Sequence, residues 1–112
     1  MPNQQIIEPG GFIHCVFFWL KEPQNQNARE QFEHHLTTFL AASQYVKSTH
    51  IGTMASSDRE VVDSTYTYCL IVTFNNKEKQ DKYQEEPVHL KFVEDAKHLW
   101  EKVVVYDSNS VF

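Results

Sequence analysis

The stretch FIHCVFFWL, which occupies residues 12–20, decides the fold. Successive side chains of a β-strand point to opposite faces of its sheet. One face of a strand over these residues would carry Phe12, His14, Val16, Phe18 and Leu20, and the other would carry Ile13, Cys15, Phe17 and Trp19. Both sets are apolar apart from one histidine, and such a strand is typical of sheets that are covered on both sides. We therefore predict that this first strand is buried on both faces.

The remainder of the chain alternates between strand-like and helix-like patterns. Strands are predicted over residues 12–20, 45–54, 61–74 and 100–106, and helices over 27–42, 77–84 and 87–99. Asn27 and Glu30 are spaced as in a capping box at the start of the first helix, and Pro87 suits the first turn of the last helix. The resulting order is β-α-β-β-α-β, with the second helix interrupted at Pro87. It predicts an α+β, ferredoxin-like fold with a four-stranded antiparallel sheet. We expect one domain over residues 1–112, with its core over about 12–108.

A ferredoxin-like sheet carries its helices on one face and leaves the other uncovered. That arrangement conflicts with a first strand that is apolar on both sides. The simplest resolution is a second copy of the chain that covers the open face. Two sheets packed face to face predict a symmetric homodimer, a dimeric α+β barrel with the helices outside.

The composition of the chain limits the classes of partner that we expect it to bind. It has 112 residues, 41% of them hydrophobic, and a formal net charge of −5 at pH 7. An acidic domain is a poor match for a phosphate backbone, so nucleic acid is not expected as a partner. The longest apolar run is too short for a bilayer, and the first ten residues lack the order of a signal peptide. We expect a cytoplasmic protein that does not bind membranes, with Cys15 and Cys69 as buried free thiols.

A single histidine stands out in the stretch DKYQEEPVHLKF, residues 81–92. On a helical wheel of about 100° per residue, His89 falls inside the apolar arc with Val88 and Phe92, whereas His98 falls on the far side. His89 also lies in the first helical turn, where unpaired N–H groups and the helix dipole disfavour a cation. Burial acts in the same direction. We therefore expect a neutral imidazole at pH 7, which is how a general base or a ligand-orienting group is prepared.

Four segments in this order resemble the stress-responsive A/B barrel (Dabb) domain family, which lies within the dimeric α+β barrel superfamily. They are HCVFFWLKE at 14–22, HIG at 50–52, YQEEPVHLKFVE at 83–94 and LWEKVVVYD at 99–107. The resemblance covers nearly the whole chain. It implies a homodimer and a stress-linked protein, and it is far more specific for the fold than for an activity.

The resemblance also extends to one catalytic member of the family, a plant polyketide cyclase that works without a metal or cofactor. Its active-site tyrosine and histidine lie in a Tyr-x-x-x-Pro-x-His pattern, and Tyr83 and His89 have that spacing. Its first-strand histidine corresponds to His14. The chain departs from the cyclase at Leu36 and Tyr68, where the cyclase has a pocket tyrosine and a further histidine.

The candidate catalytic residues are therefore His14, Tyr83 and His89. The same three residues are candidates for ligand binding, together with Tyr68 and Trp100. His89 would act as a base or an anchor, and Tyr83 would donate a hydrogen bond to a carbonyl or enolate oxygen. The alternative is a structural hydrogen bond between helix and strand, which pairs buried polar groups and catalyses nothing.

The expected function is the binding of a small, partly apolar or carbonyl-containing molecule in an internal pocket. The alternatives are an enzyme of the cyclase or isomerase kind and an inert structural assembly. A metal site built on His14, His50 and His89 is disfavoured, because the spacings match no ligand motif. We therefore expect no metal and no cofactor.

Overall fold

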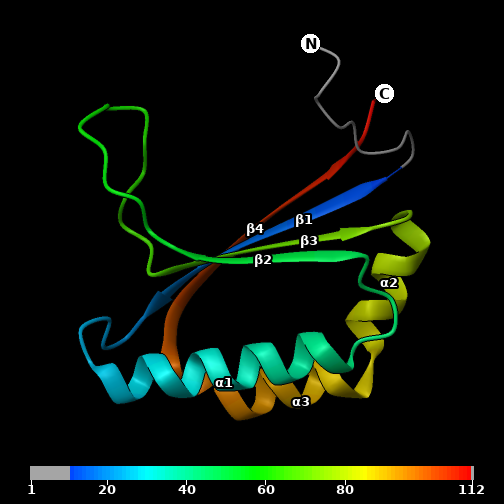
Figure 1. Cartoon of the computed structure of the whole chain (residues 1–112), viewed down its shortest axis with the longest axis horizontal. Helices are drawn as coiled ribbons and strands as arrows, with labels where there is room; N and C mark the ends of the chain where they lie inside the picture. The colour runs from blue at the N-terminus through cyan, green and yellow to red at the C-terminus, as the bar shows by residue number, and fades with distance from the viewer. Residues whose placement is uncertain (1–10, 112) are drawn as a thin grey trace.

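The structure of the chain is a computed structural model that describes residues 11–111. Its elements are β1 (Phe12–Leu20), α1 (Gln26–Ala42), β2 (Ser48–Thr53), β3 (Tyr68–Phe74), α2 (Lys77–Glu85), α3 (Pro87–Ala96), the 3-10 helix η1 (Lys97–Leu99) and β4 (Trp100–Asn109). The strands form one antiparallel sheet in the order β2-β3-β1-β4. Figure 1 shows the helices on one side of this sheet. The predicted ferredoxin-like fold is therefore confirmed.

The two faces of β1 differ in burial. The side chains that point toward the helices are buried, and they are Phe12, His14, Val16, Phe18 and Leu20. The side chains on the other face are only half-buried, and they are Ile13, Cys15, Phe17 and Trp19. Among the described residues no helix covers this second face, which we call the open face. One chain therefore buries one face of β1, and the predicted burial of the other face depends on a second copy of the chain.

The third strand begins at Tyr68 and not near residue 61. Tyr68 pairs with Thr53, the last residue of β2, so the segment before Tyr68 has no strand beside it on that side. On the other side the N–H of Thr67 still donates to the carbonyl of Phe18 in β1. The β-branched residues of this segment favour a strand by propensity alone. Asp63 instead accepts hydrogen bonds from the backbone N–H and the hydroxyl of Thr65, at 2.8 and 2.6 Å, which stabilises a turn.

Other boundaries also differ from the predicted ones, and the second strand spans Ser48–Thr53 and not 45–54. The N-cap of α1 is Asn25, whose side chain accepts from the N–H of Ala28 at 3.0 Å, and not Asn27. The last helix ends at Ala96 and continues as η1. The last strand extends to Asn109, because Asn109 still has a partner in Phe12 of β1. Residues 1–10 and 112, which the single-domain prediction includes, lie outside the described residues.

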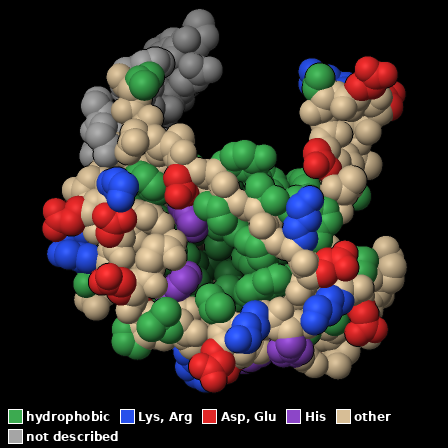
Figure 2. All heavy atoms as spheres, turned by 180° about the vertical axis from the view of Figure 1, so that it is seen from behind, with side chains coloured by type: hydrophobic (Ala, Val, Ile, Leu, Met, Phe, Trp, Pro, Cys, Tyr) green, Lys and Arg blue, Asp and Glu red, His purple; other side chains and the backbone are tan. Residues whose placement is uncertain are grey.

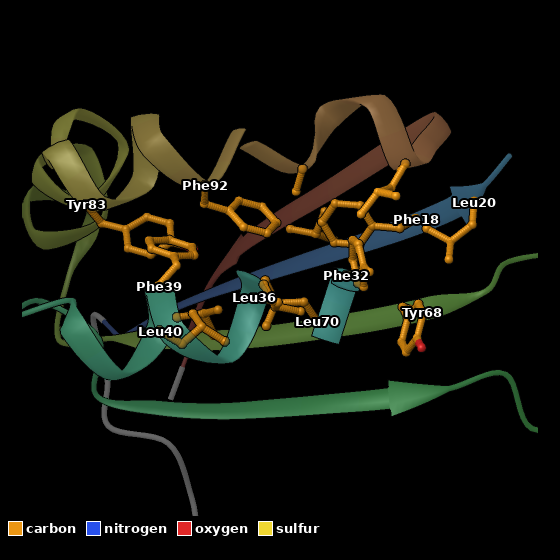
Figure 3. Close-up of a cluster of buried hydrophobic side chains, with 14 of the residues drawn as sticks. Phe18, Leu20, Phe32, Leu36, Phe39, Leu40, Tyr68, Leu70, Tyr83 and Phe92 are labelled. Atoms are coloured by element: carbon orange, nitrogen blue, oxygen red, sulfur yellow. The ribbon is translucent and has the colours of Figure 1, made fainter. Parts of the chain in front are cut away.

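The hydrophobic core lies between the sheet and the helices. Figure 3 shows the α1 side chains Phe32, Leu36 and Phe39 pointing into this layer. The ring of Phe32 stacks on Tyr68, with 4.7 Å between ring centroids, and the ring of Phe39 stacks on Phe92 at 5.2 Å. The first contact joins α1 to β3 and the second joins α1 to α3. Truncating a buried phenylalanine costs about 3–5 kcal/mol, so both contacts contribute to holding the helices on the sheet.

Candidate functional site

A cavity of about 140 Å³ lies between the sheet and the helices α2 and α3. We call it the His89 cavity. Its lining comprises His14, Val16, Phe18, Phe39, Leu70, Tyr83, Gln84, His89, Phe92, Val93, Trp100, Val103 and Val105. On this side of the molecule Figure 2 shows a hollow with hydrophobic side chains at its centre and histidines at its border. An apolar lining with a few converging polar groups is the usual character of a small-molecule site.

His14 projects into the cavity from the helix-facing side of β1. Its cross-strand neighbour in β4 is Asp107, and its Nδ1 lies 2.5 Å from the Oδ1 of that residue. A carboxylate can only accept, so Nδ1 carries the hydrogen of this contact, and in the corresponding neutral tautomer Nε2 is the acceptor. A histidine oriented by a carboxylate in this way is arranged as a general base.

His89 enters the cavity from the first turn of α3. Its ring centroid lies 5.3 Å from that of Tyr83 and 5.4 Å from that of Phe39. Burial chiefly lowers the pKa of His89 and nearby His14 lowers it further, while the backbone of Gln84 and the Glu86 carboxylate oppose the shift. The ring is therefore neutral at pH 7, as its position in the sequence predicts. Its Nδ1 is buried and has no hydrogen-bond partner among residues 11–111.

The ring of Tyr83 contacts the rings of both His14 and His89. Tyr83 is fully buried on α2, and its ring makes an edge contact with His14, with 5.9 Å between centroids. Burial, and secondly the negative charge of Glu86, raise the pKa of Tyr83 far above its ordinary value. Tyr83 therefore keeps its proton at physiological pH and can act only as a neutral hydroxyl.

Glu86 is a buried carboxylate at the junction of α2 and α3. It accepts hydrogen bonds from the Ser43 hydroxyl at 2.5 Å and from the Gln44 backbone N–H at 3.1 Å. Its own backbone carbonyl accepts from the N–H of His89 at 3.0 Å. Glu86 thus ties the start of α3 to the end of α1 and holds His89 toward the cavity.

Sequence reasoning missed both of these carboxylates. Asp107 was placed beyond the end of the last strand, and the continued alternation of Val103, Val105 and Asp107 was the signal that could have revealed it. For Glu86, the signal was an acidic residue directly before a proline at a helix start. Neither partner can be read from spacing alone, because both bonds join segments far apart in the chain.

The structure places two of the residues considered above, Tyr68 and His50, away from the His89 cavity. Trp100 lines the His89 cavity, but Tyr68 lies outside it. The Tyr68 hydroxyl donates to Glu33 on α1, and burial and that carboxylate raise the pKa of Tyr68 to about 12. His50 pairs with Ile71 across the sheet and faces away from His14, which pairs with Val72. Within residues 11–111 no group of three or more histidine, cysteine or acidic residues is placed to hold a metal.

The fold and the cavity together define a ferredoxin-like α+β protein with a site between its sheet and helices. The family model described as Stress responsive A/B Barrel Domain matches residues 12–110. The chain therefore belongs to the stress-responsive A/B barrel domain family. No curated protein matches the chain by sequence. None of the described helices is long and apolar enough to cross a membrane.

Several solved structures share the fold of this chain. A Dabb family protein from Mesorhizobium loti is similar with a TM-score of 0.76 and 22% identity, over 90% of this chain and 97% of that one. A hydroxynitrile lyase from Passiflora edulis is similar with a TM-score of 0.78 and 20% identity, over 92% and 95%. A dimeric ferredoxin-like protein of unknown function from Thermobifida fusca has a TM-score of 0.73 and 16% identity, over 96% and 97%. At these identities the likeness shows the fold alone.

Proposed function

We propose that the chain forms a homodimer and binds a small, partly apolar carbonyl compound in the His89 cavity. The observation that carries this proposal is the buried Nδ1 of His89, which has no hydrogen-bond partner within residues 11–111. A purely structural contact predicts the opposite, since buried polar atoms in inert cores are paired. The imidazole of His89 is neutral and Tyr83 is protonated, so these two groups are suited to hydrogen-bond an uncharged polar group of the ligand. The apolar lining is suited to the rest of the ligand.

The homodimer is supported by the open face of the sheet. Phe17 and Trp19 project there beside Val104 and Tyr106 of β4, and none of these side chains is fully buried in one chain. Contiguous apolar patches of this kind mark interaction sites. The related fold from Thermobifida fusca is described as dimeric, which favours the same assembly here.

Straight-chain 2-ketones, from 2-butanone to 2-heptanone, are suitable probes of the cavity. We expect titration of the longer ketones to shift the imidazole NMR signals of His89. Substituting His89→Phe removes the polar nitrogens and should weaken binding about tenfold, the effect of one hydrogen bond. His98→Phe is the matched control, because His98 is exposed on η1. Equal affinity in wild type and His89→Phe would overturn the proposal.

A second candidate function, carbonyl chemistry by a cyclase or isomerase, is favoured by the contact between His14 and Asp107. In this candidate function His14 is the base and takes a proton from the carbon beside the carbonyl of a bound ketone, while Tyr83 stabilises the enolate oxygen. One protein of this fold, from Passiflora edulis, is a hydroxynitrile lyase.

Deuterium exchange into 2-heptanone in heavy water tests this second function. We expect the wild-type protein to accelerate exchange beside the carbonyl, and Asp107→Asn to reduce the rate by about 10²-fold or more, the usual range for general base catalysis. Exchange no faster than with an equal concentration of free imidazole would leave ketone binding as the only function.

A further inference from the structure

The connection between β2 and β3, residues 54–67, projects from the molecule. We call it the β2–β3 arm. Figure 1 shows it rising from the sheet on the side away from the helices, and Figure 2 shows it from behind as a projection that carries charged side chains. Loops of more than about 12–15 residues without secondary structure are uncommon in compact domains and usually have a function.

The base of the arm is firmly anchored to the sheet. The N–H of Thr67 donates to the carbonyl of Phe18 at 2.8 Å, and the Thr67 hydroxyl accepts from the N–H of Leu20 at 3.1 Å. The indole N–H of Trp19 donates to the hydroxyl of Thr65 at 3.0 Å. Because these bonds fix the direction in which the arm leaves the sheet, the base of the arm needs no ordering when a partner binds, which lowers the conformational entropy cost of binding.

The tip of the arm exposes apolar side chains. A turn closes there, with the N–H of Val62 donating to the carbonyl of Arg59 at 3.1 Å. Val61 and Val62 at the tip are 80% and 36% exposed, and Met54 at the base of the arm is 37% exposed. A projection that is anchored at its base and presents valines to solvent is suited to contact another apolar surface.

The direction of the arm excludes one role for it. The His89 cavity lies between the sheet and the helices, whereas the arm rises on the opposite side of the sheet. It therefore cannot serve as a lid for that cavity. The arm borders the open face instead, where a hollow of about 410 Å³ is shared between its own residues and the sheet. This hollow is lined by Phe17, Trp19, Asp63, Tyr66, Lys102, Val104 and Tyr106.

We propose that the β2–β3 arm clasps a second copy of this chain seated on the open face, an inference that rests on the homodimer proposed above. Tyr66 connects the two regions, because its ring packs on Phe17 and Trp19 with centroid separations of 5.0 and 6.4 Å. Any molecule that covers the open face therefore lies directly beside the arm. Two-fold symmetry makes the contact reciprocal, so each dimer contains two such arms.

The first test compares two aspartate substitutions by sedimentation equilibrium. Val61→Asp places a charge at the arm tip, and Leu90→Asp places the same charge at an exposed position of α3, away from the open face. We expect Val61→Asp to raise the dimer dissociation constant about tenfold or more, and Leu90→Asp to leave it unchanged. An equal effect of both substitutions, or no effect of either on a dimeric wild type, would overturn the clasp and leave the dimer standing. A monomeric wild type would overturn both proposals.

Proteolysis provides a second measurement that needs no substitution. Arg29 and Arg59 are the only arginines of the chain, and Arg59 is exposed near the arm tip, whereas Arg29 lies within the helix α1. An arginine-specific protease should therefore cut first after Arg59. We expect the cutting rate to fall as the protein concentration rises through the dimer dissociation constant. A rate that is the same in monomer and dimer would contradict contact between the arm and the second copy.

Discussion

At the scale of single residues, the site consists of two imidazoles in different surroundings. His14 has a carboxylate partner in Asp107, whereas His89 has a buried nitrogen without a partner among the described residues. The inward direction of His89 could be predicted, because it depends only on helical periodicity and on its place in the first turn. The partners of the site could not, since Asp107 and Glu86 are positioned by strand register and by the packing of one helix end on another.

The lowered pKa of His89 has a consequence for stability. The unfolded chain takes up a proton at this position more readily than the folded chain does. The free energy of unfolding should therefore fall as the pH drops below about 6.5, the ordinary pKa of histidine, until the pH has passed the lowered pKa of the folded state. His89→Gln cannot take up a proton and should show a shallower decline.

Urea denaturation at a series of pH values from about 7 to 5 measures this decline. His98→Gln, at an exposed position of η1, is the matched control and is expected to follow the wild type. Identical slopes in the wild type and His89→Gln would show that burial of His89 does not contribute to the acid sensitivity of the fold.

At the scale of helices and strands, the sequence predicted which elements exist better than where they end. The nine residues of β1 were placed correctly, because an apolar run with alternating faces carries its own signal. The segment before Tyr68 was placed wrongly, because β-branched residues such as Val61 form a strand only where another strand lies beside them. The cap of α1 was misplaced by two residues. Only Asn27 has the capping-box spacing, with Glu30 three residues later, but Asn25 is the residue whose side chain caps the helix.

The position of this cap can be tested by two matched substitutions. Asn25→Ala removes the oxygen that accepts from the N–H of Ala28 and should lower the free energy of unfolding by about 1 kcal/mol. Asn27→Ala lies inside the helix and is exposed, so it should cost far less or be neutral. The two variants can be compared by chemical denaturation, and a larger loss in Asn27→Ala would place the cap at the originally predicted residue.

At the scale of the whole molecule, one layer of helices covers one face of the sheet and leaves the other face half-buried. The sequence predicted that β1 has two apolar faces, but it could not tell which of them the helices cover. Phe18 proves to face the helices and is 3% exposed, whereas Phe17 lies on the open face. The homodimer proposed above would cover Phe17, and the β2–β3 arm would hold the second copy in place.

The reactivity of Cys15 toward iodoacetamide tests this assembly most directly. Cys15 lies on the open face beside Phe17 and is half-buried in a single chain. If a second copy covers this face, the rate of Cys15 alkylation, read from its peptide by mass spectrometry, falls steeply as the protein concentration rises through the dimer dissociation constant. A rate of Cys15 alkylation that stays constant from nanomolar to high micromolar protein would contradict the proposed dimer.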